Sequence, residues 1–170
     1  MLLFLYKEGG IVMKRKILII SIIIILLIVI IGGILLWDLT KIIEQPTIYA
    51  YNVGNTTSNN GTTTLKYSLE ENGNSYIFTL YGDGVIQVKS ITKFILKNDD
   101  TVSVSYERHY TNKYFAIEAA NGSDKDIVGS LIRKDNVNYI TDTPEMTKQE
   151  MLNFFETINT SPSYEKVDLV

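Results

Sequence analysis

The sequence offers one histidine, His109, and no cysteine as starting points for catalysis. A catalytic histidine needs a nucleophile or a carboxylate within hydrogen-bonding distance. His109 lies in the stretch ERHYTN (107–112), whose polar composition predicts a turn. A zinc site built around it would need three carboxylates, which is an uncommon ligand set. We therefore expect an exposed loop histidine, no catalytic residue, no metal site and no cofactor.

Acidic side chains occur in pairs that could bind a hard cation such as Ca²⁺. The pairs are Glu70 with Glu71, Asp99 with Asp100, and Asp124 with Asp126. Each lies in a predicted turn, and no stretch has the spacing of an EF-hand loop. The alternatives are weak calcium binding and solvated turn carboxylates, and the pattern favours the second. The GDG at 82–84 predicts a hairpin turn rather than a phosphate-binding loop, because no helix pattern follows it.

One long apolar segment precedes all of these residues. The twenty residues from Ile17 to Leu36 carry no charge, and Ser21 is the one polar side chain among them. A helix of about 20 residues crosses a hydrocarbon core of about 30 Å. A secretory signal has a shorter apolar region and a small-residue cleavage site, which residues 31–33 match poorly. The length favours a transmembrane helix over 17–36, with a cleaved signal sequence as the alternative.

The residues that flank this segment predict its orientation. Lys14, Arg15 and Lys16 stand directly before it, and Trp37 follows it. Basic residues are retained on the cytoplasmic side, and tryptophan favours the membrane interface. We therefore expect a short cytoplasmic N-terminus over residues 1–16 and a C-terminal domain outside the cytoplasmic membrane.

A second methionine, Met13, stands just before the basic residues. Residues 7–10, Lys-Glu-Gly-Gly, are what a purine-rich message encodes, and such a message can contain a ribosome-binding sequence. We therefore hypothesise that translation begins at Met13, that residues 1–12 correspond to untranslated leader, and that the source is a prokaryote. The alternative is an ordinary short cytoplasmic tail.

The chain after residue 37 is acidic. It contains 12 Lys and Arg against 18 Asp and Glu, a net charge of −6. This balance argues against nucleic acid, or an anionic lipid surface, as a partner. The absence of cysteine excludes disulfides, thiolate metal sites and a lipid-modified cysteine, so the helix itself is the expected anchor. The ten tyrosines of this part would form an exposed interaction stripe or, as the commoner alternative, strand positions of a sheet.

Alternating apolar and polar residues from Thr64 onward predict an antiparallel meander. Segments 64–70 and 75–81 flank Asn72-Gly73, a strong hairpin signal. With these two residues as the turn, three apolar pairs face each other: Leu65 with Leu80, Tyr67 with Phe78, and Leu69 with Tyr76. A slip of one residue would destroy all three pairs.

Two three-residue loops would continue the meander. The loop at 82–84 would pair Phe78 with Val88 and Leu80 with Ile86, and the loop at 98–100 would pair Phe94 with Val104 and Leu96 with Val102. The strand between them, 85–96, is long, and we expect it to bend near 90–92.

Weaker patterns predict the remaining strands. They cover residues 46–53, 114–119, 126–133 and 137–141. The polar residues 54–63 predict a loop or a flexible tether. Residues 37–63 therefore form a juxtamembrane connector that contains the first strand and this polar loop.

A helix over 148–159 is predicted to follow the last strand. Thr147 and Glu150 have the spacing of a capping box, and Met151, Phe155 and Ile158 then form an apolar stripe. This stripe would lie on the apolar face of the sheet and border an interaction groove.

The fold class expected is therefore α+β. About seven or eight strands form a mostly antiparallel meander, one C-terminal helix covers it, and a single transmembrane helix precedes it. The extracytoplasmic domain would cover residues 64–159, and residues 160–170 would form a tail.

The strand GSLIRKDNVNYI followed by MTKQEMLNFFETI resembles the end of small extracytoplasmic domains of membrane-anchored lipoproteins and anti-sigma factors. Those domains have the lipoprotein-carrier and sigma-regulator fold, and the resemblance covers residues 64–158. It implies a half-open sheet that cups a helix and serves to sense or bind apolar ligands or partner proteins. The chain departs from the family because it lacks the lipobox cysteine, and because the residues before Ile17 are too few for a sigma-binding domain.

Three function classes follow from these observations. The leading one is a single-pass, membrane-anchored binding or envelope-interaction module without catalysis, whose partners are the lipid bilayer and either an envelope protein or an apolar ligand. The second is a secreted or tethered enzyme, which would require a polar pocket that includes His109. The third is a structural subunit of a membrane complex, although the apolar segment offers few small or polar residues for specific helix packing.

Overall fold

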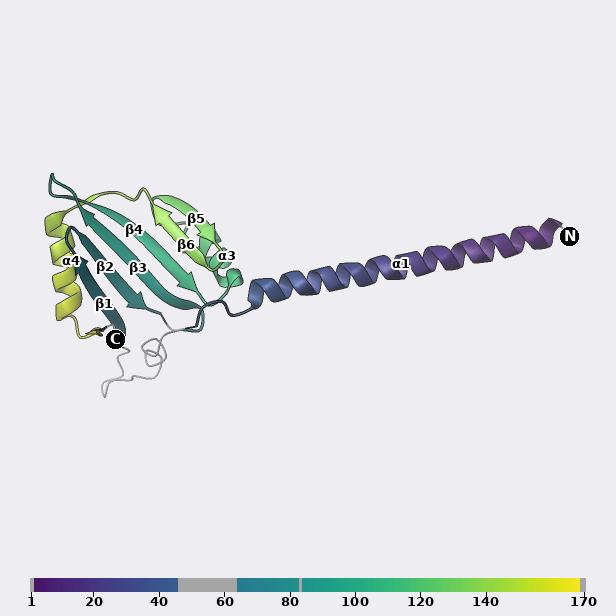
Figure 1. The fold of residues 1–170 in the computed structure, drawn as a ribbon, viewed down its shortest axis with the longest axis horizontal. Coiled ribbons are helices and arrows are strands. Elements are labelled where there is room, and N and C mark those ends of the chain that lie inside the picture. The colour runs from purple at the N-terminus through teal and green to yellow at the C-terminus, as the bar shows by residue number, and fades with distance from the viewer. Residues whose placement is uncertain (1, 46–63, 83, 169–170) are drawn as a thin grey trace. The chain divides into compact units, whose positions relative to one another are not determined.

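The computed structural model describes residues 2–45, 64–82 and 84–168, and it divides the chain into two units (Figure 1). The first unit is Met1–Leu39 and the second is Thr40–Val170. The predicted strand at 46–53 and polar loop at 54–63 lie outside the described residues.

Helix α1 (Leu2–Thr40) forms the first unit and ends at the first residue of the second. Its segment Ile17–Thr40 is 24 residues long with a mean hydropathy of 3.5, which is sufficient to cross a membrane. No part of this segment is buried against protein. A helix that is apolar on every side and exposed from Ile17 to Trp37 suits a hydrocarbon surrounding rather than water. One apolar helix of spanning length is therefore confirmed, and it continues four residues beyond the predicted end at Leu36.

The second unit is built on one sheet of eight strands (Figure 1). The strands are β1 (Leu65–Asn72), β2 (Ser75–Tyr81), β3 (Gln87–Leu96), β4 (Thr101–Tyr110), β5 (Ser130–Lys134), β6 (Val137–Thr141), β7 (Met146–Thr147) and β8 (Tyr164–Lys166). Their order across the sheet is β5-β6-β4-β3-β2-β1-β8, and β7 pairs with the start of β4. Every pair is antiparallel except β1 with β8. The predicted α+β class is confirmed.

Two helices, α3 (Lys113–Asn121) and α4 (Lys148–Thr160), cover one face of this sheet. In β4, Val102 and Val104 belong to the cluster that packs under α4. Arg108 and Tyr110, which point to the same side because side chains alternate along a strand, bond to the loop after α3. In Figure 1, α4 lies beside β1 and β2, and α3 lies beside β5 and β6.

Helix α4 begins where the sequence predicts it. The Thr147 hydroxyl accepts a hydrogen bond from the backbone N–H of Glu150 at 3.2 Å, and the Glu150 carboxylate accepts one from the N–H of Thr147 at 2.7 Å. These reciprocal bonds form a complete capping box and satisfy two backbone donors of the first helical turn.

The core lies between α4 and the sheet. Its buried members come from β1, β2, β3, β4 and α4: Tyr67, Phe78, Phe94, Val102, Val104, Met151 and Ile158. Phe154, which is outside the predicted stripe, packs against this core, with its ring centre 5.3 Å from that of Phe78 in an edge contact and 5.7 Å from that of Phe94 in a tilted one. Such aromatic pairs contribute about 0.5–1.5 kcal/mol beyond area burial.

The β1–β2 hairpin forms, but with a register two residues away from the prediction. Tyr67 pairs with Leu80, and Asn72 pairs with Ser75, so Gly73 and Asn74 form the turn. Gly73 has a φ of 61°, as the first loop position of a type II′ turn requires. A shift of two residues leaves each side chain on its predicted face, because the side-chain period is two.

The β2–β3 link is longer than the predicted three-residue loop. Leu80 pairs with Ser90 rather than Ile86, and β3 starts only at Gln87. A Cβ at Gly82 would lie 2.1 Å from the Gln87 carbonyl oxygen, so the close approach of the two backbones requires glycine. The irregularity in β3 lies between residues 87 and 89, not at the expected 90–92.

The next loop confirms the prediction. Phe94 pairs with Val104 and Leu96 with Val102 across the loop at 98–100. Asp100 adopts a φ of 63°, the left-handed conformation expected at the last position of such a loop.

The predicted strand at 114–119 is wrong, because these residues belong to α3. The side chain of Asn112 caps this helix by accepting a hydrogen bond from the backbone N–H of Phe115 at 3.0 Å. The predicted strand at 126–133 is partly wrong, since β5 begins only at Ser130. The strand at 137–141 is confirmed as β6.

The C-terminal residues are not simply a tail. Strand β8 pairs in parallel with the start of β1, and the Val167 N–H donates to the Tyr67 carbonyl at 2.7 Å. Besides the predicted C-terminal helix, the second unit thus contains a second helix, α3, and a strand at one edge of the sheet, β8.

Candidate functional site

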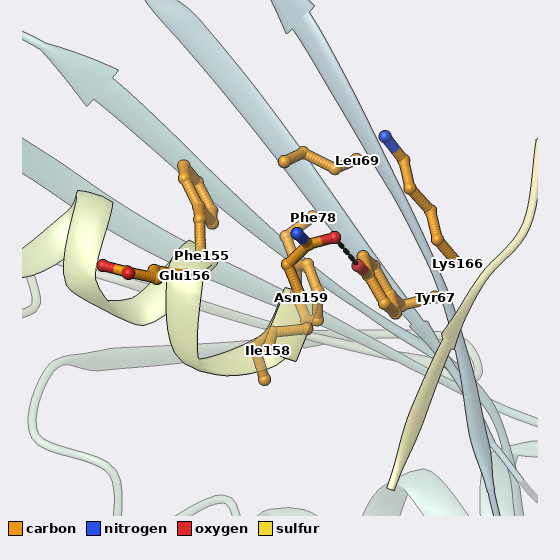
Figure 2. Close-up of a pocket in the computed structure, with 8 residues that line it drawn as sticks. All are labelled: Tyr67, Leu69, Phe78, Phe155, Glu156, Ile158, Asn159 and Lys166. Atoms are coloured by element: carbon orange, nitrogen blue, oxygen red, sulfur yellow. Dashed lines mark hydrogen bonds between the residues drawn. The ribbon is translucent and has the colours of Figure 1, made fainter. Parts of the chain in front are cut away.

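A groove runs between the C-terminal half of α4 and the β1–β8 edge of the sheet (Figure 2). Its volume is about 400 Å³. Eight side chains line it: Tyr67, Leu69, Phe78, Phe155, Glu156, Ile158, Asn159 and Lys166. The floor is aromatic and aliphatic, and the polar groups lie at the rim. An apolar cavity with few polar groups is the usual form of a small-molecule or peptide site.

Two of the three residues predicted to border a groove lie in it. Phe155 and Ile158 line the groove from α4, as Figure 2 shows. Met151 does not, because it lies one turn earlier and is completely buried in the core. Burial of Met151 fixes the helix on the sheet, whereas Phe155 and Ile158 shape the wall of the groove.

The sequence did not indicate the polar rim. The Tyr67 hydroxyl donates to the side-chain oxygen of Asn159 at 3.4 Å, which closes one end of the groove (Figure 2). Lys166 reaches the rim from β8, and no ion pair is found for it among residues 2–45, 64–82 and 84–168. Because the sequence did not predict β8, it could not place this ammonium group beside α4.

A buried polar network joins β4, β6 and the loop after α3. Asp124 is completely buried and accepts hydrogen bonds from Arg108 at 2.6 Å, the Tyr110 hydroxyl at 2.7 Å and the Asn138 amide at 2.7 Å. The prediction of a solvated turn carboxylate at Asp124 is therefore wrong. Burial and the bond to Asp124 raise the pKa of Tyr110 far above its usual value, so its hydroxyl stays protonated and continues to donate.

His109 is not an exposed loop residue, since it lies in β4 with its side chain only 15% exposed. Its Nδ1 is 2.8 Å from a carboxylate oxygen of Glu44, and its Nε2 is 3.5 Å from a carboxylate oxygen of Glu107. Lys89 reaches the other Glu44 oxygen at 2.9 Å, and the Asn136 amide donates to Glu44 at 3.3 Å. The Nδ1 atom thus faces a carboxylate that Lys89 also contacts, whereas Nε2 is buried without a hydrogen-bond partner among the described residues.

These contacts perturb the two carboxylates. Burial alone would raise the pKa of Glu44, but hydrogen bonds from His109 and Lys89, and their positive charges, outweigh it and lower the pKa. Burial alone would likewise raise the pKa of Glu107. Its hydrogen bonds and charge interactions with Lys93 and His109 outweigh burial, so the pKa of Glu107 is lowered. Both groups are therefore held ionised as parts of an ion-pair network, which is a structural role.

The remaining acidic pairs lie in a turn and in a strand. Asp99 caps the turn by accepting hydrogen bonds from the Thr101 hydroxyl at 2.5 Å and from the Thr101 backbone N–H at 3.1 Å, and these bonds lower its pKa. Glu70 and Glu71 lie in β1 rather than in the predicted turn. Within the part of the chain that the structure describes, no three His, Asp or Glu side chains are grouped as metal ligands.

The topology residues all lie in α1. Lys14, Arg15 and Lys16 precede the apolar segment, and Trp37 stands near its end with 66% of its surface exposed.

No family model, curated protein or solved structure matches this chain. The site must therefore be interpreted from its own geometry.

Proposed function

We propose that this protein is a single-pass membrane protein that holds a non-catalytic binding domain on the outer side of the cytoplasmic membrane. The groove between α4 and the β1–β8 edge is the observation that carries this proposal. Its apolar floor and charged rim fit an amphipathic ligand or an apolar segment of an envelope protein.

The anchor and its orientation support the location. The segment Ile17–Thr40 is long and apolar enough to span a bilayer, and its residues from Ile17 to Trp37 are exposed. The basic residues that precede it and Trp37 near its end favour a cytoplasmic N-terminus. The groove would then face the extracytoplasmic space.

The polar clusters support a binding role over an enzymatic one. An active site needs a general base within reach of a nucleophile or a substrate, in a cavity. The Nδ1 atom of His109 is occupied by Glu44, and the carboxylate of Asp124 accepts from Arg108, Tyr110 and Asn138. Neither group lines the groove, whose titratable members are Tyr67, Glu156 and Lys166.

Photo-crosslinking in intact cells tests the groove. A benzophenone amino acid replaces Phe155, which lines the groove, or Leu152, which lies on the same helix but is exposed outside the groove. We expect adducts from position 155 and none from position 152. A protein partner changes mobility on a gel, whereas a small apolar ligand adds a defined mass to the intact chain.

Two outcomes would contradict the proposal. Equal adducts at positions 155 and 152 would show general surface contact rather than groove occupancy. The absence of adducts from position 155, or turnover of a ligand recovered there, would exclude a non-catalytic binding groove.

A further inference from the structure

An apolar patch surrounds the point where the chain enters the second unit. Nine large apolar side chains are exposed on the described residues of this unit, and five of them are in the patch. Its members are Ile42, Ile43, Val85, Ile86 and Tyr114, with exposed fractions of 67%, 41%, 71%, 46% and 45%. Scattered exposed apolar residues are normal, but a cluster of five indicates contact with something apolar.

Hydrogen bonds to Thr111 hold these segments together. The Thr111 N–H donates to the Ile86 carbonyl at 3.0 Å, and its hydroxyl donates to the Val85 carbonyl at 3.0 Å. The Ile43 N–H in turn donates to the Thr111 carbonyl at 2.8 Å. Phe115 lies between two shallow hollows, one lined by Ile42 and Val85 and the other by Ile86 and Tyr114. The five residues therefore form one surface, which we call the entry patch.

The connector that follows α1 is fixed to the same end of the sheet. The Asn112 amide donates to the Thr40 carbonyl at 3.3 Å, and Thr40 is the last residue of α1. Glu44 is bonded to His109, Lys89 and Asn136, as described above. Residues 40–44 are thus attached to the domain rather than forming a loose tether.

This attachment limits how far the entry patch can lie from the end of the apolar helix. Trp37, the residue expected at the membrane interface, is three residues before Thr40, and three helical residues advance only about 5 Å. The patch begins two residues after Thr40. Whatever angle the helix makes with the domain, chain connectivity alone keeps this end of the sheet close to the interface.

We propose that the entry patch inserts into the boundary between headgroups and acyl chains of the bilayer that α1 spans. This inference rests on the proposed function, because it requires α1 to remain in the membrane. Partially inserted apolar and aromatic side chains are stabilised at this depth. The net charge of −6 after residue 37 gives no attraction to anionic lipid, so insertion depends on apolar burial and occurs in uncharged bilayers.

Site-directed fluorescence tests the proposal on the full chain, which has no native cysteine. Single-cysteine variants are labelled with an environment-sensitive fluorophore in phosphatidylcholine vesicles, with or without lipid that carries a nitroxide quencher near the headgroup. Val85→Cys is matched with Val128→Cys, because the native side chains are 71% and 69% exposed. Ile86→Cys is matched with Leu152→Cys, at 46% and 43%.

At positions 85 and 86 we expect the emission of the fluorophore to shift to the blue and to be quenched by the nitroxide lipid. At positions 128 and 152 we expect neither change. Leu152 borders Thr101, at the opposite end of β4 from Tyr110, so it reports on a surface far from the entry patch. Water-exposed emission at 85 and 86, equal to the controls, would overturn the proposal. A blue shift without lipid quenching would also overturn it, because protein, such as a second copy of the chain, would then cover the patch.

A fifth label separates this inference from the proposed function. Leu27→Cys lies in the middle of the apolar segment, and a second lipid that carries its nitroxide near the end of the acyl chain quenches this label whenever α1 spans the bilayer. Quenching at position 27 without quenching at 85 and 86 refutes only the inserted patch. Absence of quenching at position 27 refutes the membrane anchor, and the inserted patch with it.

Discussion

Replacing Asp124 by alanine should cause a large loss of stability. Asp124 is completely buried and neutralises Arg108, whose side chain is 26% exposed. Removing one partner of a buried ion pair costs about 3–5 kcal/mol, because the other charge is left without compensation. Since Arg108 retains some contact with solvent, we expect the lower end of this range, about 3 kcal/mol.

The remaining partners of Asp124 make this loss difficult to avoid. The Tyr110 hydroxyl and the Asn138 amide would each lose an acceptor inside the protein. Among the described residues, Arg108 Nε and Asn138 Oδ1 are already buried without a hydrogen-bond partner, so the loss of Asp124 would add to the unpaired polar atoms of this network.

Urea denaturation of the full chain in detergent measures this loss. Near-UV circular dichroism follows the tyrosines of the domain, whereas far-UV signal would be dominated by α1. With an m-value of about 2 kcal/mol/M, a loss of about 3 kcal/mol lowers the midpoint by about 1.5 M.

Asp126→Ala is the matched control, because Asp126 is an exposed aspartate in the same loop. Its replacement should change the free energy of unfolding by no more than about 0.5 kcal/mol. If the two variants had the same midpoint, Asp124 would not be the centre of a buried network, and our account of this end of the sheet would be wrong.

Two further predictions concern local interactions. Thr147→Ala removes the cap of α4 and should lower the free energy of unfolding by about 1 kcal/mol in the same urea assay. Thr147→Ser, which keeps a hydroxyl, should retain most of this free energy. Equal stability of the unchanged protein and both variants would contradict the capping box. Glu44 has a lowered pKa in the folded protein, so its contribution to connector docking is present above its usual value of 4.5 and is lost as pH falls through the folded value. Hydrogen exchange at the Ile43 amide, corrected for the intrinsic rate, should therefore accelerate as the solution is acidified below 4.5, and Glu44→Gln should remove this dependence. Constant protection of Ile43 over that range would show that Glu44 does not hold the connector.

The elements that sequence predicted well depend on neighbouring residues. The capping box and the apolar stripe of α4 lie within twelve residues, from Thr147 to Ile158. The β3–β4 register follows from a three-residue loop in which Asp100 accepts a positive φ. Such features need no knowledge of the rest of the fold, so local pattern was sufficient.

The elements that sequence missed depend on distant residues or on competing local signals. Residues 114–119 include the bulky Tyr114, Phe115 and Ile117, which favour a strand, but the Asn112 cap, which the strand interpretation overlooked, starts a helix. Strand β8 has only three residues and exists because β1, about 100 residues earlier, offers it a free edge. No pattern inside 164–166 indicates that pairing.

The candidate site, too, could be predicted only where it depends on residues that are neighbours in the sequence. The apolar wall from Phe155 and Ile158 followed from the helix, but the rim contributed by Lys166 required β8. Asp124 and His109 were assigned to exposed loops, because polar residues near turns are usually solvated. Their burial results from tertiary contacts with Arg108 and Glu44, which lie 16 and 65 residues away in the sequence.

The most direct test of the account is cysteine accessibility on intact cells. Val128→Cys places one thiol on the surface of the domain of a chain that has no native cysteine. A maleimide that cannot cross membranes should label this thiol without permeabilisation, and the labelled chain should remain in the membrane fraction with α1 attached. Labelling only after permeabilisation, or recovery of the domain without α1 in the medium, would contradict a membrane-anchored domain that faces outward.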